Sequence, residues 1–157
     1  MSPKNWGPPI WTFFHTLAEK INEDKFETVG PELFRYIASI CNNLPCPECT
    51  SHAKYFLSKV DPRRVNSKKA LKDLLFVFHN IVSKRKNRPL FRYVEFLEAY
   101  KDKNLIVTFN NFLKAYSTDG NMKLMTENFH RKRFLINFNK WFAANIINFD
   151  LKPTQSN

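Results

Sequence analysis

Residues 67–83 read SKKALKDLLFVFHNIVS, and their pattern indicates the fold class. Apolar side chains recur three and four residues apart, which is the spacing of one face of an α-helix. Ser67 belongs to the residue types favoured at a helix N-cap, and Pro89 ends the helix after the basic run at 84–88. The apolar stripe consists of Leu71, Leu74, Leu75, Phe78, Ile81 and Val82. The stretch therefore predicts a long amphipathic helix.

The same helical spacing recurs along most of the chain, whereas 3 Gly against 9 Pro argues against an all-β design. We expect helices that enter at Pro8-Pro9, begin near Gly30-Pro31, begin at Cys46, and cover about 91–101, 104–116 and 129–148, with a turn at 117–121. The predicted fold is all-α: a four-helix bundle over residues 1–100 and a helical extension over 101–150, packed on the bundle or at a dimer face. Residues 151–157 are expected to be a frayed tail.

Composition limits the class of protein. With 157 residues, 43% of them hydrophobic, the chain suits one domain with a core and is too apolar for wholesale disorder. The net charge of +11 predicts an anionic partner, which is a nucleic acid, a membrane surface or a phosphate-bearing cofactor. No run approaches the roughly 20 apolar residues of a membrane span, and the first residues lack the apolar core of a secretory signal. We therefore expect a cytoplasmic protein without a transmembrane segment.

The three cysteines are too few for a disulfide scaffold, so they are available for chemistry. Cys46 and Cys49 form a C-x-x-C pair at a predicted helix start, where the sulfurs are close enough to bond and the helix N-terminus lowers a thiol pKa. This arrangement favours a redox-active dithiol. The alternative is a zinc site made of Cys41, Cys46, Cys49 and His52, in a basic helical module that contacts nucleic acid or protein. The position of Cys41 on the apolar face of a helix speaks against zinc.

A thioredoxin-like protein also uses C-x-x-C, but places it after a strand in a βαβ unit. No strand is predicted before Cys46, so that class is excluded. A helical dithiol without a second cysteine pair needs another electron acceptor, and a bound cofactor is the simplest one.

Three patterns occur in order along the chain. Residues 6–18 read WGPPIWTFFHTLA, residues 44–49 read LPCPEC, and residues 78–83 read FHNIVS, followed by Arg85, Arg88 and Pro89. Together they resemble the opening helix, the active-site dithiol and the H-N-x-V-N-x-K-x-x-K-P signature of the Erv/ALR flavin-linked sulfhydryl oxidases. The run CPECTSHA at 46–53 is most similar to the viral members. The resemblance covers about residues 6–100.

The resemblance implies an activity and its cofactor. FAD is expected at the mouth of the bundle, where the enzyme turns protein dithiols into disulfides and reduces molecular oxygen to hydrogen peroxide. Cys46 corresponds to the outer sulfur that exchanges with substrate, and Cys49 to the sulfur that lies against the flavin. Nucleic acid is then not the expected partner.

The cofactor contacts are also implied, residue by residue. The expected cofactor-binding residues are Trp11, His15, Cys49, His79, Asn80, Val82, Ser83, Arg85, Arg88 and Tyr100. Trp11 and His15, one helical turn apart, correspond to the adenine side, and Arg85 and Arg88 replace lysines near the pyrophosphate. Ser83 stands where the family usually has a second asparagine. By pattern alone, Trp11 with His15, and equally His79, also fit ordinary core packing.

The chain also departs from the cellular members of the family. It lacks their carboxy-terminal structural disulfide and their shuttle dithiol, and Cys41 fits a buried small hydrophobe. We therefore expect a separate thioredoxin-like or small dithiol protein as substrate, and a homodimer by analogy with the family. The run HRKR at 130–133 is expected to be a solvated helix start, with partner docking as the alternative. For a viral protein the expected location is the host cytoplasm, with the virion as a second one.

Overall fold

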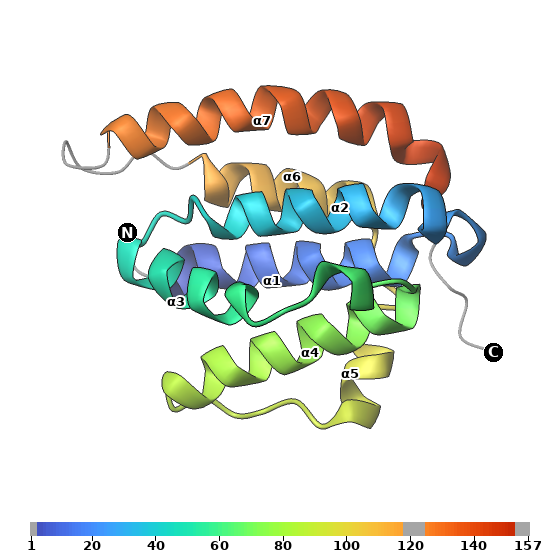
Figure 1. Cartoon of the computed structure of the whole chain (residues 1–157), viewed down its shortest axis with the longest axis horizontal. Coiled ribbons are helices and arrows are strands. Elements are labelled where there is room, and N and C mark those ends of the chain that lie inside the picture. The colour runs from blue at the N-terminus through green and yellow to red at the C-terminus, as the bar shows by residue number, and fades with distance from the viewer. Residues whose placement is uncertain (1–2, 118–124, 153–157) are drawn as a thin grey trace.

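The structure is a computed structural model that describes residues 3–117 and 125–152 (Figure 1). Its elements are α1 (Pro3–Lys20), η1 (Glu23–Lys25), α2 (Phe26–Cys41), α3 (Pro47–Ser58), η2 (Pro62–Arg64), α4 (Lys68–Arg85), α5 (Tyr93–Ala99), α6 (Leu105–Tyr116), α7 (Met125–Asn145) and η4 (Ile146–Asn148). The only β-type pairing in these two ranges is an isolated bridge between Ile21 and Phe149. The all-α prediction is confirmed. Most of the predicted turn at 117–121 and the end of the predicted tail lie outside the described residues.

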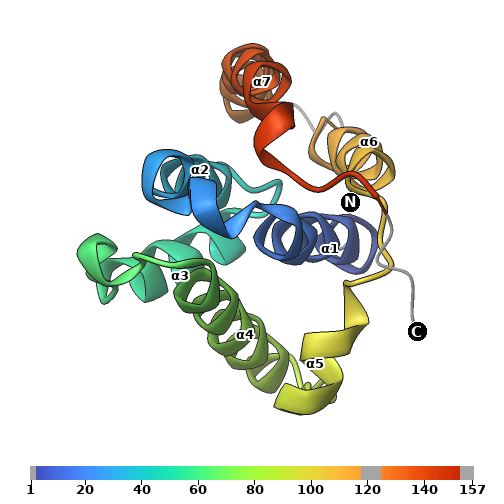
Figure 2. The same ribbon diagram turned by 90° about the vertical axis from the view of Figure 1, so that its right-hand side faces the viewer.

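Helix α1 is the centre of the molecule. Viewed end on, it has α2, α3 and α4 on one side and α6 on the other, with α7 above, between α2 and α6 (Figure 2). Its buried side chains therefore point in nearly every direction and include Trp6, Ile10, Phe13, Phe14, His15, Leu17 and Ile21. No helix of the described ranges is long and apolar enough to cross a membrane.

Aromatic rings join α6 and α7 to α1. The fully buried ring of Phe13 lies 4.6 Å from Phe112 of α6, and 6.1 Å from Phe138 and Phe142 of α7, measured between ring centroids. Phe109 of α6 also lies 4.5 Å from Phe142. Such pairs add to the burial of apolar area, which is the main source of stability in a core. Helices α6 and α7 thus pack on the bundle through a layer of aromatic rings.

Helix α1 begins earlier than predicted. Pro8 and Pro9 lie inside it, although proline lacks the N–H that an interior helical residue donates. The lost hydrogen bonds fall near the helix start, and Trp6, only 4% exposed, ties this first part of the helix to the core. Tertiary burial therefore extends the helix beyond the prolines.

Helix α2 also begins earlier than predicted, at Phe26 rather than at Gly30-Pro31. Phe26 and Val29 are buried, which anchors the turn that precedes Pro31. Gly30 packs directly under the ring of Phe26, and a Cβ at this position would overlap that ring. The glycine therefore serves a close contact and does not mark a helix start.

Helices α3 and α4 begin as predicted. Ser67 caps α4, since its Oγ accepts a hydrogen bond from the Ala70 N–H at 3.0 Å. The buried stripe of α4 is narrower than predicted, because Leu71, Leu75 and Phe78 are buried while Ile81 is 46% exposed. Ile81, predicted to belong to the same apolar stripe, is therefore not part of the buried core.

The run at 130–133 is not a helix start, and its solvation is only partly as predicted: His130, Lys132 and Arg133 are exposed, whereas Arg131 is buried. Helix α7 begins at Met125, so the run lies in its second turn. Arg131 is only 1% exposed and its guanidinium carbon lies 6.0 Å from the centre of the Tyr116 ring. The aromatic layer between α6 and α7 accommodates this cation, which a sequence pattern does not reveal.

Candidate functional site

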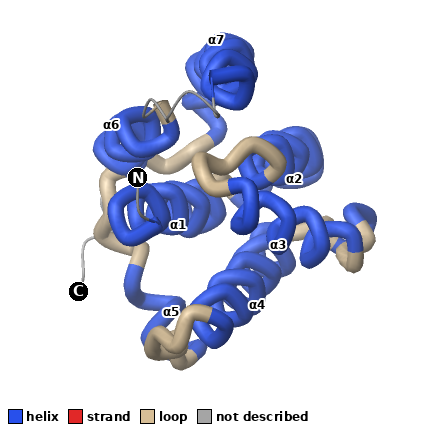
Figure 3. The backbone as a smooth tube through the Cα atoms, turned by 90° about the vertical axis from the view of Figure 1, so that its left-hand side faces the viewer, coloured by secondary structure: helices blue, strands red, loops and turns tan. Residues whose placement is uncertain are grey.

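The candidate site lies at one end of the bundle, where α1 and α3 begin and α2 and α4 end (Figure 3). A cleft at this end is lined by side chains from all four helices, among them Trp11, Cys49, His79 and Val82. The sequence places these residues far apart along the chain. Antiparallel packing of four helices brings them together.

The cysteine pair forms a disulfide between Cys46 and Cys49. Cys46 is the N-cap of α3, Pro47 follows as the first helical residue, and the Cys49 N–H donates to Cys46 Sγ at 3.2 Å. The preceding loop is held by the Leu44 N–H, which donates to Thr50 Oγ1 at 3.1 Å. Backbone donors and the helix dipole at this position favour a negatively charged sulfur. Cys49 lines the cleft, whereas Cys46 is not among its lining residues.

The third cysteine, Cys41, is buried as an unreactive thiol. Cys41 is 2% exposed, and burial raises the pKa of its thiol to about 12, so the thiolate is not populated near neutral pH. Within residues 3–117 and 125–152, no three His, Cys, Asp or Glu side chains are grouped so as to hold a metal ion. The His52 ring instead lies 3.5 Å from the carboxylate of Glu48.

Aromatic and imidazole rings form one wall of the cleft. Trp11 and His79 stack with centroids 4.3 Å apart and planes 2° apart, and Trp11 also stacks on His15 at 5.7 Å. His15 is 2% exposed and packs on Tyr100 at 4.7 Å. Rings from α1 and α4 thus share a single stack.

The two histidines are hydrogen-bonded to each other. His15 Nε2 lies 2.8 Å from His79 Nδ1, so one nitrogen donates and the other accepts. His15 Nδ1 is buried without a hydrogen-bond partner in the described residues, and a buried N–H without an acceptor is the rarer and costlier case. We therefore assign the proton of His15 to Nε2, which makes His79 Nδ1 the acceptor and leaves His79 Nε2–H as a free donor.

Both imidazoles are held neutral. Burial, and then the Arg88 charge, lower the pKa of His79 to about 4. Burial, and then His79, hold the pKa of His15 well below its usual value. The hydrogen bond between them therefore persists at neutral pH without competing protonation.

Cations surround the mouth of the cleft. Arg85, Lys86 and Arg88 line it, and no described carboxylate lies within ion-pair distance of any of them. Burial, and then the two arginines, lower the pKa of Lys86. A mouth with this charge suits an anionic group such as a pyrophosphate.

The predicted site residues separate into two sets. Trp11, Cys49, His79, Val82, Ser83, Arg85 and Arg88 line the cleft, and His15, Asn80 and Tyr100 do not. The Asn80 side chain instead accepts from the Phe91 N–H at 2.9 Å and donates to the Phe91 carbonyl at 3.1 Å. His15 and Tyr100 lie behind the lining ring of His79. These three residues support the cleft wall from outside it.

Some lining residues carried no role in the sequence interpretation. Trp6, Ile10, Phe14 and Phe78 belong to the apolar wall, and Lys86 joins the two predicted arginines. The available signals were the WGPP motif and the unbroken basic run at 84–86. Trp6 Nε1 is buried without a hydrogen-bond partner among the described residues, so its N–H is available to donate to a ligand in the cleft.

Comparison with known proteins identifies the family. The sequence profile of the Erv1/Alr family matches residues 8–101, which contain the dithiol and nearly all of the cleft. The chain belongs to the Erv1/Alr family. Residues 102–152, including α6 and α7, lie outside the matched segment.

Viral and cellular relatives agree with the Erv1/Alr assignment. The 096R protein of Invertebrate iridescent virus 3 is 31% identical over 102 residues, covering 64% of this chain and 69% of the relative. The FAD-linked sulfhydryl oxidase of African swine fever virus (isolate Pig/Kenya/KEN-50/1950) is 27% identical over 117 residues, 73% of this chain and 98% of the relative. The mitochondrial FAD-linked sulfhydryl oxidase erv1 of Schizosaccharomyces pombe is 26% identical over 86 residues, which cover 54% of this chain and 47% of the relative. No solved structure matches the chain.

Proposed function

We propose that the protein is an FAD-linked sulfhydryl oxidase that converts protein dithiols to disulfides through Cys46 and Cys49. One observation carries the proposal: the disulfide lies at the edge of an aromatic cleft, and only its inner sulfur, Cys49, lines that cleft. This arrangement gives each sulfur a different neighbour. The names of the relatives support the same activity and the same cofactor.

The residues of the cleft fit FAD. Trp11 and His79 offer flat faces for ring stacking, and the apolar wall suits the isoalloxazine. The Nε1–H of Trp6 has no acceptor among the described residues, and the assigned tautomer of His79 leaves its Nε2–H outside the bond to His15, so both could donate to the polar edges of a flavin. Arg85 and Arg88 would hold the pyrophosphate, and bidentate hydrogen bonding makes arginine well suited to that task.

Thiol exchange at the disulfide follows from its geometry. A substrate thiolate attacks Cys46 Sγ, the Cys46–Cys49 bond breaks, and Cys49 leaves as a thiolate. A second substrate thiolate then attacks the substrate sulfur of the mixed disulfide and releases Cys46 as a thiolate. The Cys49 N–H, which donates to Cys46 Sγ at 3.2 Å, stabilises that leaving group. The substrate loses two electrons and two protons, and the electrons reside on the cysteine pair.

When bound in the cleft, FAD would supply the two-electron acceptor that lets the Cys46–Cys49 disulfide re-form, with molecular oxygen as the proposed final oxidant and hydrogen peroxide as its product. The protein supplies the position of Cys49 and a cleft wall held by the two histidines. Tautomer and orientation of His79 are fixed from behind by His15, as a supporting group fixes a catalytic imidazole.

The substrate dithiol comes from another molecule. This sequence contains no second cysteine pair, and the buried Cys41 is unsuited to thiol exchange. A thioredoxin-like or small dithiol protein is therefore the proposed partner. The viral relatives favour action in a host cytoplasm. The homodimer stays a prediction, which light scattering on the purified protein tests.

A visible spectrum tests the activity directly. We expect purified protein to be yellow and its flavin absorbance to bleach when dithiothreitol is added without oxygen, then to return with air. Cys49→Ser should stay yellow and fail to bleach. Wild-type protein that folds but binds no FAD would contradict the proposal.

A further inference from the structure

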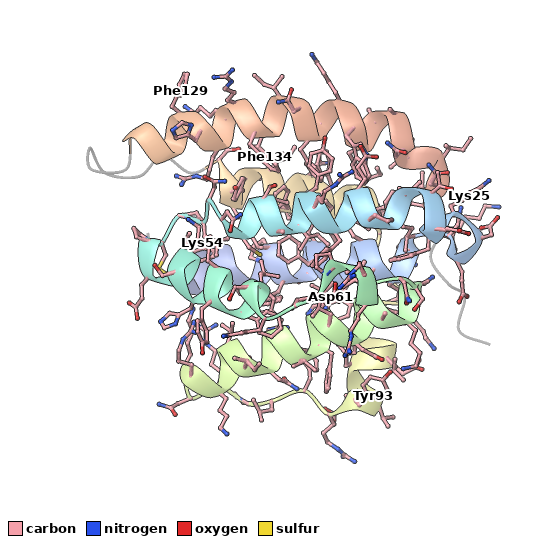
Figure 4. All side chains as sticks on the ribbon, viewed as in Figure 1. Lys25, Lys54, Asp61, Tyr93, Phe129 and Phe134 are labelled. Carbon is pink, nitrogen blue, oxygen red and sulfur yellow. A yellow bond between two sulfur atoms is a disulfide. The ribbon has the colours of Figure 1, made fainter. Side chains whose placement is uncertain are left out.

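The outer face of α7 presents apolar side chains to solvent. Phe129 is 62% exposed and Ile136 is 58% exposed, although both belong to a helix whose other face is packed in the core. Figure 4 shows Phe129 on the outer side of α7 and Phe134 on the side toward the rest of the molecule. Ile147, 81% exposed, lies in η4 directly after the helix. None of these three side chains belongs to the hydrophobic core formed by the described residues.

The helical spacing places the first two on one line. Phe129, Ile136 and Ala143 are seven residues apart, which is about two helical turns, and each step drifts by only about 20°. At 1.5 Å per residue, the line from 129 to 143 is about 21 Å long. Ile147 lies just beyond it, in the 3-10 turn η4 that follows the end of α7 at Asn145. We call Phe129, Ile136, Ala143 and Ile147 the α7 stripe.

Cations accompany the α7 stripe. Arg133 and Lys140 are exposed between its members, and no described carboxylate lies within ion-pair distance of either. The sequence from 128 to 149 contains no Asp or Glu. This surface is therefore apolar and basic together, on a chain that already carries +11.

We propose that the α7 stripe binds the surface of an anionic lipid bilayer, with α7 lying in the plane of the headgroups. Phe and Ile would enter the boundary between headgroups and acyl chains, and Arg133 and Lys140 would contact the anionic headgroups. Long basic side chains keep their charge in the polar layer while their stems lie along apolar surface.

The pattern favours a bilayer over a protein helix or a second copy of the chain. A helix that packs on α7 needs apolar residues at both alternating positions of a seam, but the positions between the stripe residues hold cations and asparagine. A second copy would bring the same cations face to face without acids to pair them. A lipid surface requires only a line of apolar contacts and positive charge. The α7 stripe lies outside residues 8–101, so the proposal is independent of the oxidase function.

Co-sedimentation with vesicles tests the proposal. Full-length protein should bind vesicles of equimolar phosphatidylserine and phosphatidylcholine, should not bind phosphatidylcholine alone, and should dissociate as salt is raised. The triple variant Phe129→Ser, Ile136→Ser, Ile147→Ser should bind at least roughly tenfold more weakly. Arg133→Gln with Lys140→Gln should weaken binding by roughly tenfold or more.

A matched control separates binding by the α7 stripe from nonspecific binding by any exposed apolar side chain. Val77→Ser with Val94→Ser removes two exposed aliphatic side chains from α4 and α5, 47% and 70% exposed, and should leave vesicle binding unchanged. All variants should keep the wild-type circular dichroism, since the altered side chains are solvent-exposed.

Insertion itself has a direct readout. Phe129→Trp should add fluorescence that brominated phosphatidylserine quenches, whereas Tyr55→Trp, at an exposed position of α3, should add fluorescence that is not quenched. Equal vesicle binding by the wild type and the triple stripe variant would overturn the proposal. Failure of the wild type to bind the anionic vesicles, with or without binding to an acidic peptide, would overturn it as well.

Discussion

The two sides of α1 have opposite characters. On the side of α3 and α4, α1 contributes Trp11 and His15 to a stack that contains imidazole nitrogens and borders an open cleft. On the side of α6 and α7, it contributes the fully buried Phe13 to a layer of phenyl rings. One helix thus serves chemistry with one face and stability with the other. Changes on the two sides should therefore be separable.

The largest expected effect is on the chemical side. Cys49→Ser removes the sulfur that lines the cleft and should lower thiol-oxidase turnover by roughly a thousandfold or more. The melting temperature should change little, because the α3 N-cap at Cys46 remains. Oxygen consumption with dithiothreitol measures the turnover, and retained activity in this variant would contradict the assignment of Cys49.

The next effect is on stability alone. Phe138→Ala leaves a cavity beside Phe13 in a fully buried site and should cost about 3–5 kcal/mol of unfolding free energy. Denaturant unfolding measures this loss. Under native conditions the variant that remains folded should keep the flavin spectrum. If the folded variant lost FAD, the two sides of α1 would be coupled.

The histidine pair should make stability depend on pH. The pKa of His79 is about 4 in the folded protein, mainly through burial, against about 6.5 for an unfolded histidine. As pH falls from 6.5 to 4, the unfolded chain takes up a proton that folded His79 does not. Stability present above pH 6.5 should therefore decline by up to about 3 kcal/mol.

Unfolding curves between pH 7 and pH 4 check this decline. His79→Phe keeps a ring against Trp11 and removes the titrating group, so its curve should be flatter. An unchanged slope would mean that other groups cause the pH dependence.

The smallest effects come from a matched pair of helix caps. Ser67→Ala in α4 and Asn104→Ala in α6 each remove one N-cap hydrogen bond, of 3.0 and 3.1 Å, and should cost about 1 kcal/mol. Of these two caps, only Ser67 belongs to a helix whose side chains line the cleft. A loss of FAD affinity in Asn104→Ala as large as in Ser67→Ala would remove the distinction between the two regions.

Local patterns predicted well where the decisive interaction is itself local. The caps at Ser67 and Cys46 depend on residues three positions apart; Ser67 was predicted as a cap and Cys46 as a helix start. The starts of α1 and α2 were missed, because burial of Trp6 and Phe26 outweighs the signals of Pro8 and Pro31. Arg131 was placed in solvent for the same reason, since its environment is supplied by α6.

The sequence alone determined the helical class, the C-x-x-C pair at a helix start and the family, because these rest on periodicity and on motifs within short segments. Tertiary structure decided which side chains meet: that His15 bonds to His79 across 64 positions, that Asn80 supports the wall from behind, and that α7 keeps one apolar face exposed. The physical reason is that helical spacing fixes which residues share a face. Only the packing of one helix on another fixes what that face contacts.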